Sequence, residues 1–120
     1  MENKAFGNQG EKLALNYLSE QGYQIKATNW YYKHKEIDII AEKDSMLCII
    51  EVKTRSNDFN EVPNELVPRK KQRFLIDAAE AFINQHDFDL ETRFDVVFIF
   101  YQNGKPNIQH ITDAFEPHLL

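Results

Sequence analysis

Two carboxylates and a lysine lie close together in the sequence, in two segments rich in isoleucine. Asp38 lies in Glu-Ile-Asp-Ile-Ile, and Glu51 and Lys53 lie in Ile-Glu-Val-Lys-Thr. Carboxylates hold hard divalent cations such as Mg²⁺, together with water and phosphate oxygens. A lysine beside such a cation can contact a phosphate, orient an attacking water or take its proton. These residue types therefore have the chemistry that hydrolysis of a phosphodiester bond requires.

The spacing of these residues predicts that they meet. Residues 36–42 and 46–54 are predicted to be the strands of a hairpin, joined by a two-residue turn at Asp44 and Ser45. In the register that this turn sets, Asp38 faces Glu51, and opposed Cβ atoms lie about 4.5–5.5 Å apart. Two carboxylates this close repel each other, and a divalent cation between them reverses the sign of the interaction. A slip of one residue in the register would move each side chain to the other face.

The same residues also fit a solvated face of a sheet that is held by cross-strand ion pairs. Glu36 would face Lys53 in this register and would be the partner of its ammonium group. The isoleucines on both strands argue against a freely solvated ribbon, because they require burial.

Hydrophobic periodicity predicts the elements that position these residues. Apolar residues recur at helical spacing in two segments, and Asn103-Gly104 predicts a hairpin turn near the end of the chain. The predicted elements are a helix at 8–21, strands at 24–30, 36–42 and 46–54, a polar loop at 56–67, a helix that begins at Pro68, and strands at 94–101 and 107–112. The order αβββαββ predicts a mixed α/β domain in which helices pack on a sheet.

Length and composition exclude several classes of protein. A chain of 120 residues with 42% hydrophobic and 28% charged residues predicts one globular domain over residues 1–120. The net charge of −5 excludes a strongly basic, nonspecific polyanion binder, so a nucleic-acid binder would need a local basic patch or a metal. The single cysteine, Cys48, excludes an intrachain disulfide framework and a Cys-rich zinc site. No apolar run approaches the length of a membrane span, and the first residues lack the apolar region of a secretory signal, so we expect a cytoplasmic protein with no membrane partner.

Two motifs resemble the YraN family of small bacterial proteins: Glu-Ile-Asp-Ile-Ile-Ala at 36–41 and Ile-Glu-Val-Lys-Thr-Arg at 50–55. Further matching pieces are Gly10-Glu11, Ala14, Tyr17-Leu18, Gly22-Tyr23, Asn29, Lys71-Gln72 and residues 93–97. That family is placed in the restriction-endonuclease-like PD-(D/E)XK superfamily and is similar to archaeal Holliday-junction resolvases. The resemblance implies a mixed β-sheet flanked by helices, and cleavage of DNA that depends on Mg²⁺ or Mn²⁺.

The resemblance also implies roles for individual residues. Asp38 and Glu51 would be metal ligands, with the carbonyl of Val52 as a third, and Lys53 would be the catalytic lysine. Glu11 matches an N-terminal acidic residue that in related nucleases helps to hold metal or water, although it also reads as an exposed residue of the first helix.

Basic residues gather at the start of the second helix and just beyond the Glu-x-Lys motif. They are Arg69, Lys70, Lys71 and Arg73 on the helix, and Arg55 on the strand. Such a cluster is either a solvated face or the local basic patch that an acidic nucleic-acid binder needs. The resemblance places Gln72, with Lys71, at a helix position that can contact a substrate phosphate, and Arg55 is a candidate phosphate contact.

Other features leave alternatives open. Trp30, Tyr31 and Tyr32 could stack on unpaired bases or pack at the end of a strand. Arg93 and Asp95 flank an apolar strand, and we expect them to form a structural ion pair. The chain departs from the family pattern at Lys35, where glycine is frequent, at Tyr31, where arginine is frequent, and at Ile37, where the superfamily motif has proline.

The leading hypothesis is a metal-dependent endonuclease that acts on DNA, in particular on branched or otherwise non-duplex DNA. The alternative is a catalytically silent nucleic-acid-binding module on a nuclease fold, and a purely structural domain is a weaker third. Symmetric cutting of a four-way junction would need a homodimer, and no segment of the sequence predicts a dimer face.

Overall fold

The computed structural model describes residues 2–55 and 67–116, with side chains from residue 8 onward. Its elements are α1 (Glu2–Glu20), β1 (Gln24–Tyr32), β2 (Lys35–Lys43), β3 (Met46–Arg55), α2 (Arg69–His86), β4 (Glu91–Gln102) and β5 (Lys105–Ile111). The predicted order αβββαββ is confirmed, and most elements extend beyond the predicted ends. The loop predicted at 56–67 lies outside the described residues except for Val67. No helix in the described ranges has the length and apolar character of a membrane span.

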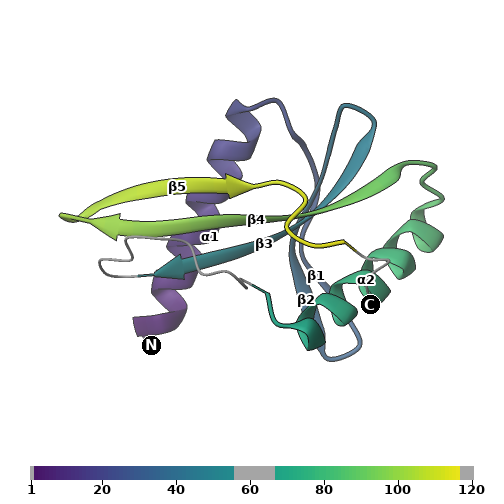
Figure 1. The fold of residues 1–120 in the computed structure, drawn as a ribbon, viewed down its shortest axis with the longest axis horizontal. Helices are drawn as coiled ribbons and strands as arrows, with labels where there is room; N and C mark the ends of the chain where they lie inside the picture. Colours follow the sequence, from purple (N-terminus) through teal and green to yellow (C-terminus); the bar gives the residue numbers. More distant parts are fainter. Residues whose placement is uncertain (1, 56–66, 117–120) are drawn as a thin grey trace.

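The strands form one mixed sheet with the order β1-β2-β3-β4-β5. β3 and β4 pair in parallel, whereas the other neighbours pair antiparallel. A parallel pair needs a long crossover, and the segment that contains α2 supplies it. Figure 1 shows α1 and α2 on opposite sides of this sheet. The arrangement confirms the mixed sheet flanked by helices and is that of a restriction-endonuclease-like fold.

Each face of the sheet buries its own apolar cluster. The side chains of α2 that pack on one face are Leu75, Ala78, Ala79 and Phe82, against residues such as Ile49, Val96 and Phe98. Ala14 and Leu18 of α1 pack on the other face against Ile39, Ile50 and Val97. Because both faces of the sheet are covered, the sequences of β3 and β4 are nearly continuous runs of apolar residues. A charged side chain on these strands is therefore buried unless it lies near their ends.

The β2–β3 hairpin has the predicted turn, with Asp44 and Ser45 at φ 52° and 63°. The predicted register is also confirmed for the pairs Lys43–Met46, Glu42–Leu47, Ala41–Cys48, Ile40–Ile49 and Ile39–Ile50. The ladder ends there, because β2 continues beside β1 while β3 continues beside β4. The prediction that Asp38–Glu51 and Glu36–Lys53 are directly opposed pairs is therefore wrong. The two strands separate just before the carboxylates.

A buried polar network ties β4 to α1 and β5. Asp95 is 1% exposed and accepts hydrogen bonds from Arg93 Nε at 2.9 Å, His110 Nε2 at 2.8 Å and the Asp113 N–H at 3.1 Å. Burial alone would raise the pKa of Asp95, but the hydrogen bonds from His110 and Arg93 bring it below its ordinary value. The Tyr17 hydroxyl lies 3.3 Å from His110 Nδ1. The ion pair expected between Arg93 and Asp95 is confirmed, and its role is structural.

Gly10 lets α1 lie directly against the end of β3. A Cβ atom at this position would overlap the Thr54 hydroxyl oxygen and would lie 3.3 Å from the Thr54 Cβ. Only glycine allows this approach of backbone to side chain, and it brings the next residue, Glu11, close to the point where β2 and β3 separate.

We expect Gly10→Ala to lower the free energy of unfolding by about 1–2 kcal/mol. Overpacking costs about 1–3 kcal/mol, and this cost outweighs the gain in helix propensity, which is at most about 1 kcal/mol. Urea denaturation measures the change. Thr54→Ala removes the atoms that overlap, so the double variant Gly10→Ala/Thr54→Ala should recover the loss. A Gly10→Ala chain as stable as the wild type would show that the close contact is not required.

Candidate functional site

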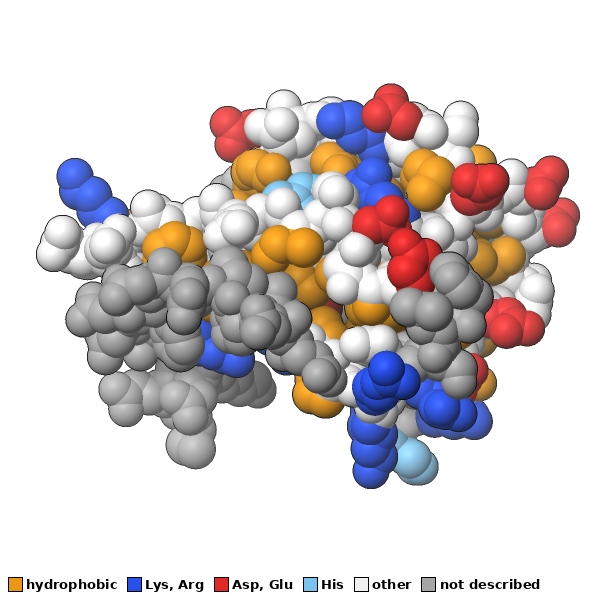
Figure 2. All heavy atoms as spheres, viewed as in Figure 1, with side chains coloured by type: hydrophobic (Ala, Val, Ile, Leu, Met, Phe, Trp, Pro, Cys, Tyr) orange, Lys and Arg blue, Asp and Glu red, His pale blue; other side chains and the backbone are white. Residues whose placement is uncertain are grey.

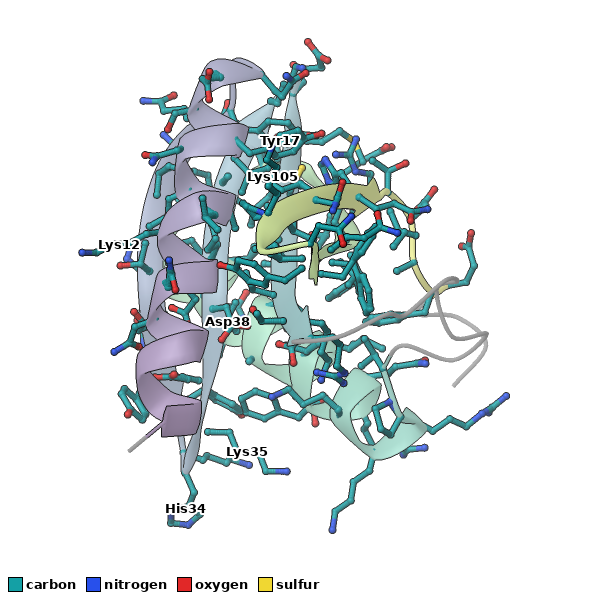
Figure 3. All side chains as sticks on the ribbon, turned by 90° about the vertical axis from the view of Figure 1, so that its left-hand side faces the viewer. Lys12, Tyr17, His34, Lys35, Asp38 and Lys105 are labelled. Carbon is teal, nitrogen blue, oxygen red and sulfur yellow. The ribbon has the colours of Figure 1, made fainter. Side chains whose placement is uncertain are left out.

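The candidate site lies in the gap that opens where β2 and β3 separate. Asp38 Oδ2 accepts a hydrogen bond from the Val52 N–H at 2.8 Å. The N–H and C=O of one strand residue point to the same side, so the Val52 carbonyl also faces this gap. Figure 3 shows Asp38 between α1 and α2, and residues of both helices act on its charge. The structure therefore brings Asp38 and Val52 together through the Val52 N–H, whereas the resemblance implied a role for the Val52 carbonyl.

Glu51 is the second carboxylate of the site and is only 5% exposed. Its Oε2 lies 3.4 Å from Lys53 Nζ and 3.6 Å from Lys71 Nζ. Its Oε1 is buried and has no hydrogen-bond partner among the described residues. A buried carboxylate oxygen without a partner is costly, and a cation ligated there would remove the cost.

The two carboxylates influence each other although they are not a direct cross-strand pair. Burial and, after it, the negative charge of Glu51 raise the pKa of Asp38, which lies at about 7. The hydrogen bond from Val52 and the positive charge of Lys71 oppose this rise. The repulsion predicted from the sequence is thus present as the second cause after burial, and Asp38 changes its protonation state near neutral pH.

Glu11 reaches the rim of the site through Asn29. Asn29 Nδ2 donates to Glu11 Oε1 at 3.0 Å and to Glu36 Oε1 at 3.3 Å, and the charge of Glu11 raises the pKa of Asp38. Asn29 has a φ of 48°, a left-handed conformation that asparagine tolerates better than most residues. Sequence reasoning assigns no role to Asn29, although Asn29 is one of the residues that match the YraN family. The expected partnership of Glu36 with Lys53 is wrong, because Glu36 bonds to Asn29 and Lys53 lies beside Glu51.

The predicted phosphate contacts lie in different surroundings. Lys71 contacts Glu51 and so belongs to the site itself, whereas Lys70 and Arg73 are exposed. Gln72 Nε2 donates a hydrogen bond to the Val67 carbonyl at 2.8 Å. The side-chain amide of Gln72 is therefore engaged with the main chain just before α2. Arg55 is also exposed, and its Nη1 donates to the Thr54 carbonyl at 2.9 Å. Of these residues, Lys71 alone is brought into contact with a carboxylate in the described part of the chain.

The donor set of the gap fits a hard cation. Asp38 and Glu51 offer carboxylate oxygens, the Val52 carbonyl faces the same space, and Glu51 Oε1 lacks a partner. Mg²⁺ is typically held by one or two carboxylates and completes its shell with water. No group of three or more His, Cys, Asp or Glu side chains converges within residues 8–55 and 67–116, which does not fit a closed zinc site there.

A mixed sheet covered by a helix on each face, with an aspartate and a Glu-x-Lys motif at the gap between two strands, defines a restriction-endonuclease-like domain of the PD-(D/E)XK type. The chain belongs to the uncharacterised protein family UPF0102, whose sequence profile matches residues 10–99. This is the YraN family that the motifs predicted.

Similar relatives occur in several bacteria. The UPF0102 protein of Bacteroides thetaiotaomicron is 41% identical over 119 residues, which cover 99% of this chain and 98% of the relative. The UPF0102 protein of Flavobacterium johnsoniae is 44% identical over 120 residues, which cover 95% of this chain and 96% of the relative. The similarity therefore extends over almost the whole length of both proteins.

We expect Asp38→Asn to stabilise the metal-free protein at pH 8. The pKa of Asp38 is about 7 in the folded chain and near 3.8 in the unfolded chain, so its ionised form opposes folding. The gain in the free energy of unfolding should be on the order of 2–4 kcal/mol above pH 7, should shrink as the pH falls, and should vanish near pH 4.

Chemical denaturation in EDTA across this pH range measures the gain. Asp89→Asn is the matched control, since Asp89 is exposed and its substitution should have a small effect at every pH. A constant difference between Asp38→Asn and wild type from pH 4 to pH 8 would contradict the raised pKa.

Proposed function

We propose that the protein is a metal-dependent endonuclease that hydrolyses phosphodiester bonds of DNA at the gap between β2 and β3. The observation that carries the proposal is the buried Glu51 carboxylate, whose Oε1 has no partner in the described part of the chain while Lys53 and Lys71 lie beside its Oε2. A merely structural acid would be expected to have both oxygens satisfied, as Asp95 has.

Asp38, Glu51 and the Val52 carbonyl would hold Mg²⁺ or Mn²⁺. The bound cation would lower the pKa of a coordinated water and neutralise the charge that develops on the phosphorus oxygens. Asp38 would lose its proton as it becomes a ligand, because only the ionised carboxylate binds metal well.

Lys53 would position the reactants. It lies two residues after Glu51 on the same strand, and therefore on the same face, with its Nζ 3.4 Å from Glu51 Oε2. From there its ammonium group can donate to a phosphate oxygen or to the attacking water. Attack in line would break the bond between phosphorus and the 3′-oxygen, which takes up a proton, and would leave a 5′-phosphate and a 3′-hydroxyl.

A catalytically silent nucleic-acid-binding module is the second candidate, and one observation favours it. Two ammonium groups already lie beside Glu51 Oε2, so this oxygen has its charge balanced without a metal. Such a module would bind DNA with a strong dependence on salt and would not cleave it.

Cleavage of labelled DNA separates the two candidates. We expect the wild-type chain with Mg²⁺ or Mn²⁺ to cut at least one of duplex, single-stranded, flapped and four-way-junction DNA. Glu51→Gln and Lys53→Met should each reduce the rate by about 100-fold or more, since each removes a group that acts in the transition state.

Glu91→Gln is the control for this assay, because it removes one exposed carboxylate at the start of β4. Equal cutting by wild type and Glu51→Gln would identify a contaminant. Salt-dependent binding of DNA without cutting of any substrate would favour the silent module.

Metal binding gives a test that does not depend on activity. We expect calorimetry with Mn²⁺ to detect a site that is lost in Asp38→Asn and Glu51→Gln and retained in Glu91→Gln. Because the pKa of Asp38 is about 7, affinity should rise between pH 6 and pH 8 and binding should release a proton. Titration in two buffers of different ionisation enthalpy measures this proton. Binding of equal strength in Asp38→Asn would place the cation elsewhere.

A further inference from the structure

Basic side chains gather at one end of this acidic molecule. The turn between β1 and β2 carries Lys33 and His34, and Lys35 follows directly as the first residue of β2; all three are exposed. The start of α2 carries Arg69, Lys70 and Arg73, which are also exposed. Figure 2 shows lysine, arginine and histidine side chains at the lower edge, where Figure 1 places this turn and the start of α2. Acidic side chains gather on other parts of the same view. The net charge of −5 is therefore unevenly distributed, with a local positive surface at the β1–β2 turn.

A line of contacts leads from the candidate site to this turn. Lys71 Nζ lies 3.6 Å from Glu51 Oε2 and 5.7 Å from the centre of the Phe74 ring. Lys35 Nζ lies 5.8 Å from the centre of the same ring. Phe74 thus lies beside two ammonium groups, one of which contacts the buried carboxylate and the other of which directly follows the β1–β2 turn.

Aromatic rings line the same end of the hairpin. Trp30 and Tyr32 are stacked with their ring centres 6.4 Å apart, and both pack against the apolar cluster under α2. Lys33 Nζ lies 5.2 Å from the centre of the Tyr32 ring. Tyr31, between them, points to the opposite face and is 68% exposed, the one large hydrophobic side chain so exposed in residues 8–55 and 67–116. The lysine contact is therefore to Tyr32, and the exposed ring of Tyr31 lies on the other face of the edge strand β1. Aromatic rings on a basic surface are typical of proteins that bind single-stranded nucleic acid.

The geometry fits one strand better than a duplex. Lys35 precedes Asp38 by three residues on β2, which is about 10 Å at the rise of a strand, or about three stacked nucleotides. An exposed ring such as Tyr31 can stack only on a base that is not paired within a duplex.

We propose that the β1–β2 hairpin binds an unpaired strand of DNA that leads into the gap between β2 and β3. Lys33 and Lys35 contact its phosphates on the face that α2 covers, and Tyr31 stacks on one of its bases where the strand passes over the edge strand β1. The proposal rests on the proposed nuclease function and specifies its substrate class, which is DNA with a single-stranded segment next to the bond that is cut.

Fluorescence anisotropy of the full chain in EDTA tests the lysines, with labelled oligothymidine and a blunt duplex of equal length as probes. The variant is Lys33→Gln/Lys35→Gln. The matched control is Lys12→Gln/Lys105→Gln, which removes the same charge from exposed sites away from the turn, as Figure 3 shows. We expect the hairpin variant to bind oligothymidine about 25-fold more weakly at 0.1 M salt and to lower the salt slope by about 1.4, with little change in the control.

Tyr31 separates stacking from charge. We expect Tyr31→Ala to weaken binding of oligothymidine by about 5- to 100-fold, Tyr31→Phe to retain it, and binding of the blunt duplex to change little in either variant. Thermal unfolding of each variant confirms that it is folded. The proposal is overturned by equal losses for duplex and single strand, by no loss in Tyr31→Ala, or by equal losses in the hairpin variant and its control.

The readouts distinguish this proposal from the proposed function. A chain that binds oligothymidine through the hairpin and cuts no DNA would refute the nuclease and leave this inference standing. A chain that cuts DNA with Mg²⁺ while its hairpin variants bind and cut every substrate as the wild type does would refute this inference alone.

Discussion

The hydrogen bond from the Val52 N–H to Asp38 is the interaction on which the candidate site depends. The β2–β3 ladder ends at Ile39–Ile50, so β3 beyond this point would present main-chain groups without a cross-strand partner. The Asp38 carboxylate accepts a hydrogen bond from one of these groups, the Val52 N–H. An acidic side chain, rather than water, therefore satisfies this main-chain group at the gap. If the strands had stayed paired, the same two carboxylates would repel each other across a closed sheet with no space for a ligand.

The protein buries acids in two different ways, and the contrast separates structure from candidate function. Asp95 receives hydrogen bonds from Arg93, His110 and Asp113, and its pKa falls below the ordinary value despite burial. Asp38 receives a hydrogen bond from Val52 and lies near Glu51, and its pKa rises to about 7. Burial acts in the same direction on both, so the difference comes from the partners. An acid whose partners leave its charge unfavourable is suited to exchange a proton for a cation.

Local pattern in the sequence was sufficient to predict the elements, the turn at residues 44–45 and the register of the hairpin as far as Ile39–Ile50, because turn length and alternation determine them. The place where the ladder ends was not predictable in this way. It depends on β1 holding β2 and on β4 holding β3 in parallel, and the second of these pairings joins segments more than 35 residues apart. Lys71 reaches Glu51 for the same reason, since α2 is placed by this crossover. The left-handed conformation of Asn29 was not predictable from local pattern, although Asn29 is among the residues that match the YraN family.

The acidic charge of the chain and its local basic surface act together in the proposed function. Free charges in solution are screened beyond about 10 Å at 0.1 M salt, so a bound strand responds to the side chains nearest to it rather than to the net charge of −5. Lys35 and Lys71 each lie within that distance of the Phe74 ring, and Lys71 Nζ lies 3.6 Å from Glu51 Oε2. The acidic remainder of the surface disfavours other positions for a polyanion. In the proposed function, a chain that is acidic overall would therefore direct DNA to the local basic surface beside the candidate site, where a uniformly basic chain would hold it in many orientations.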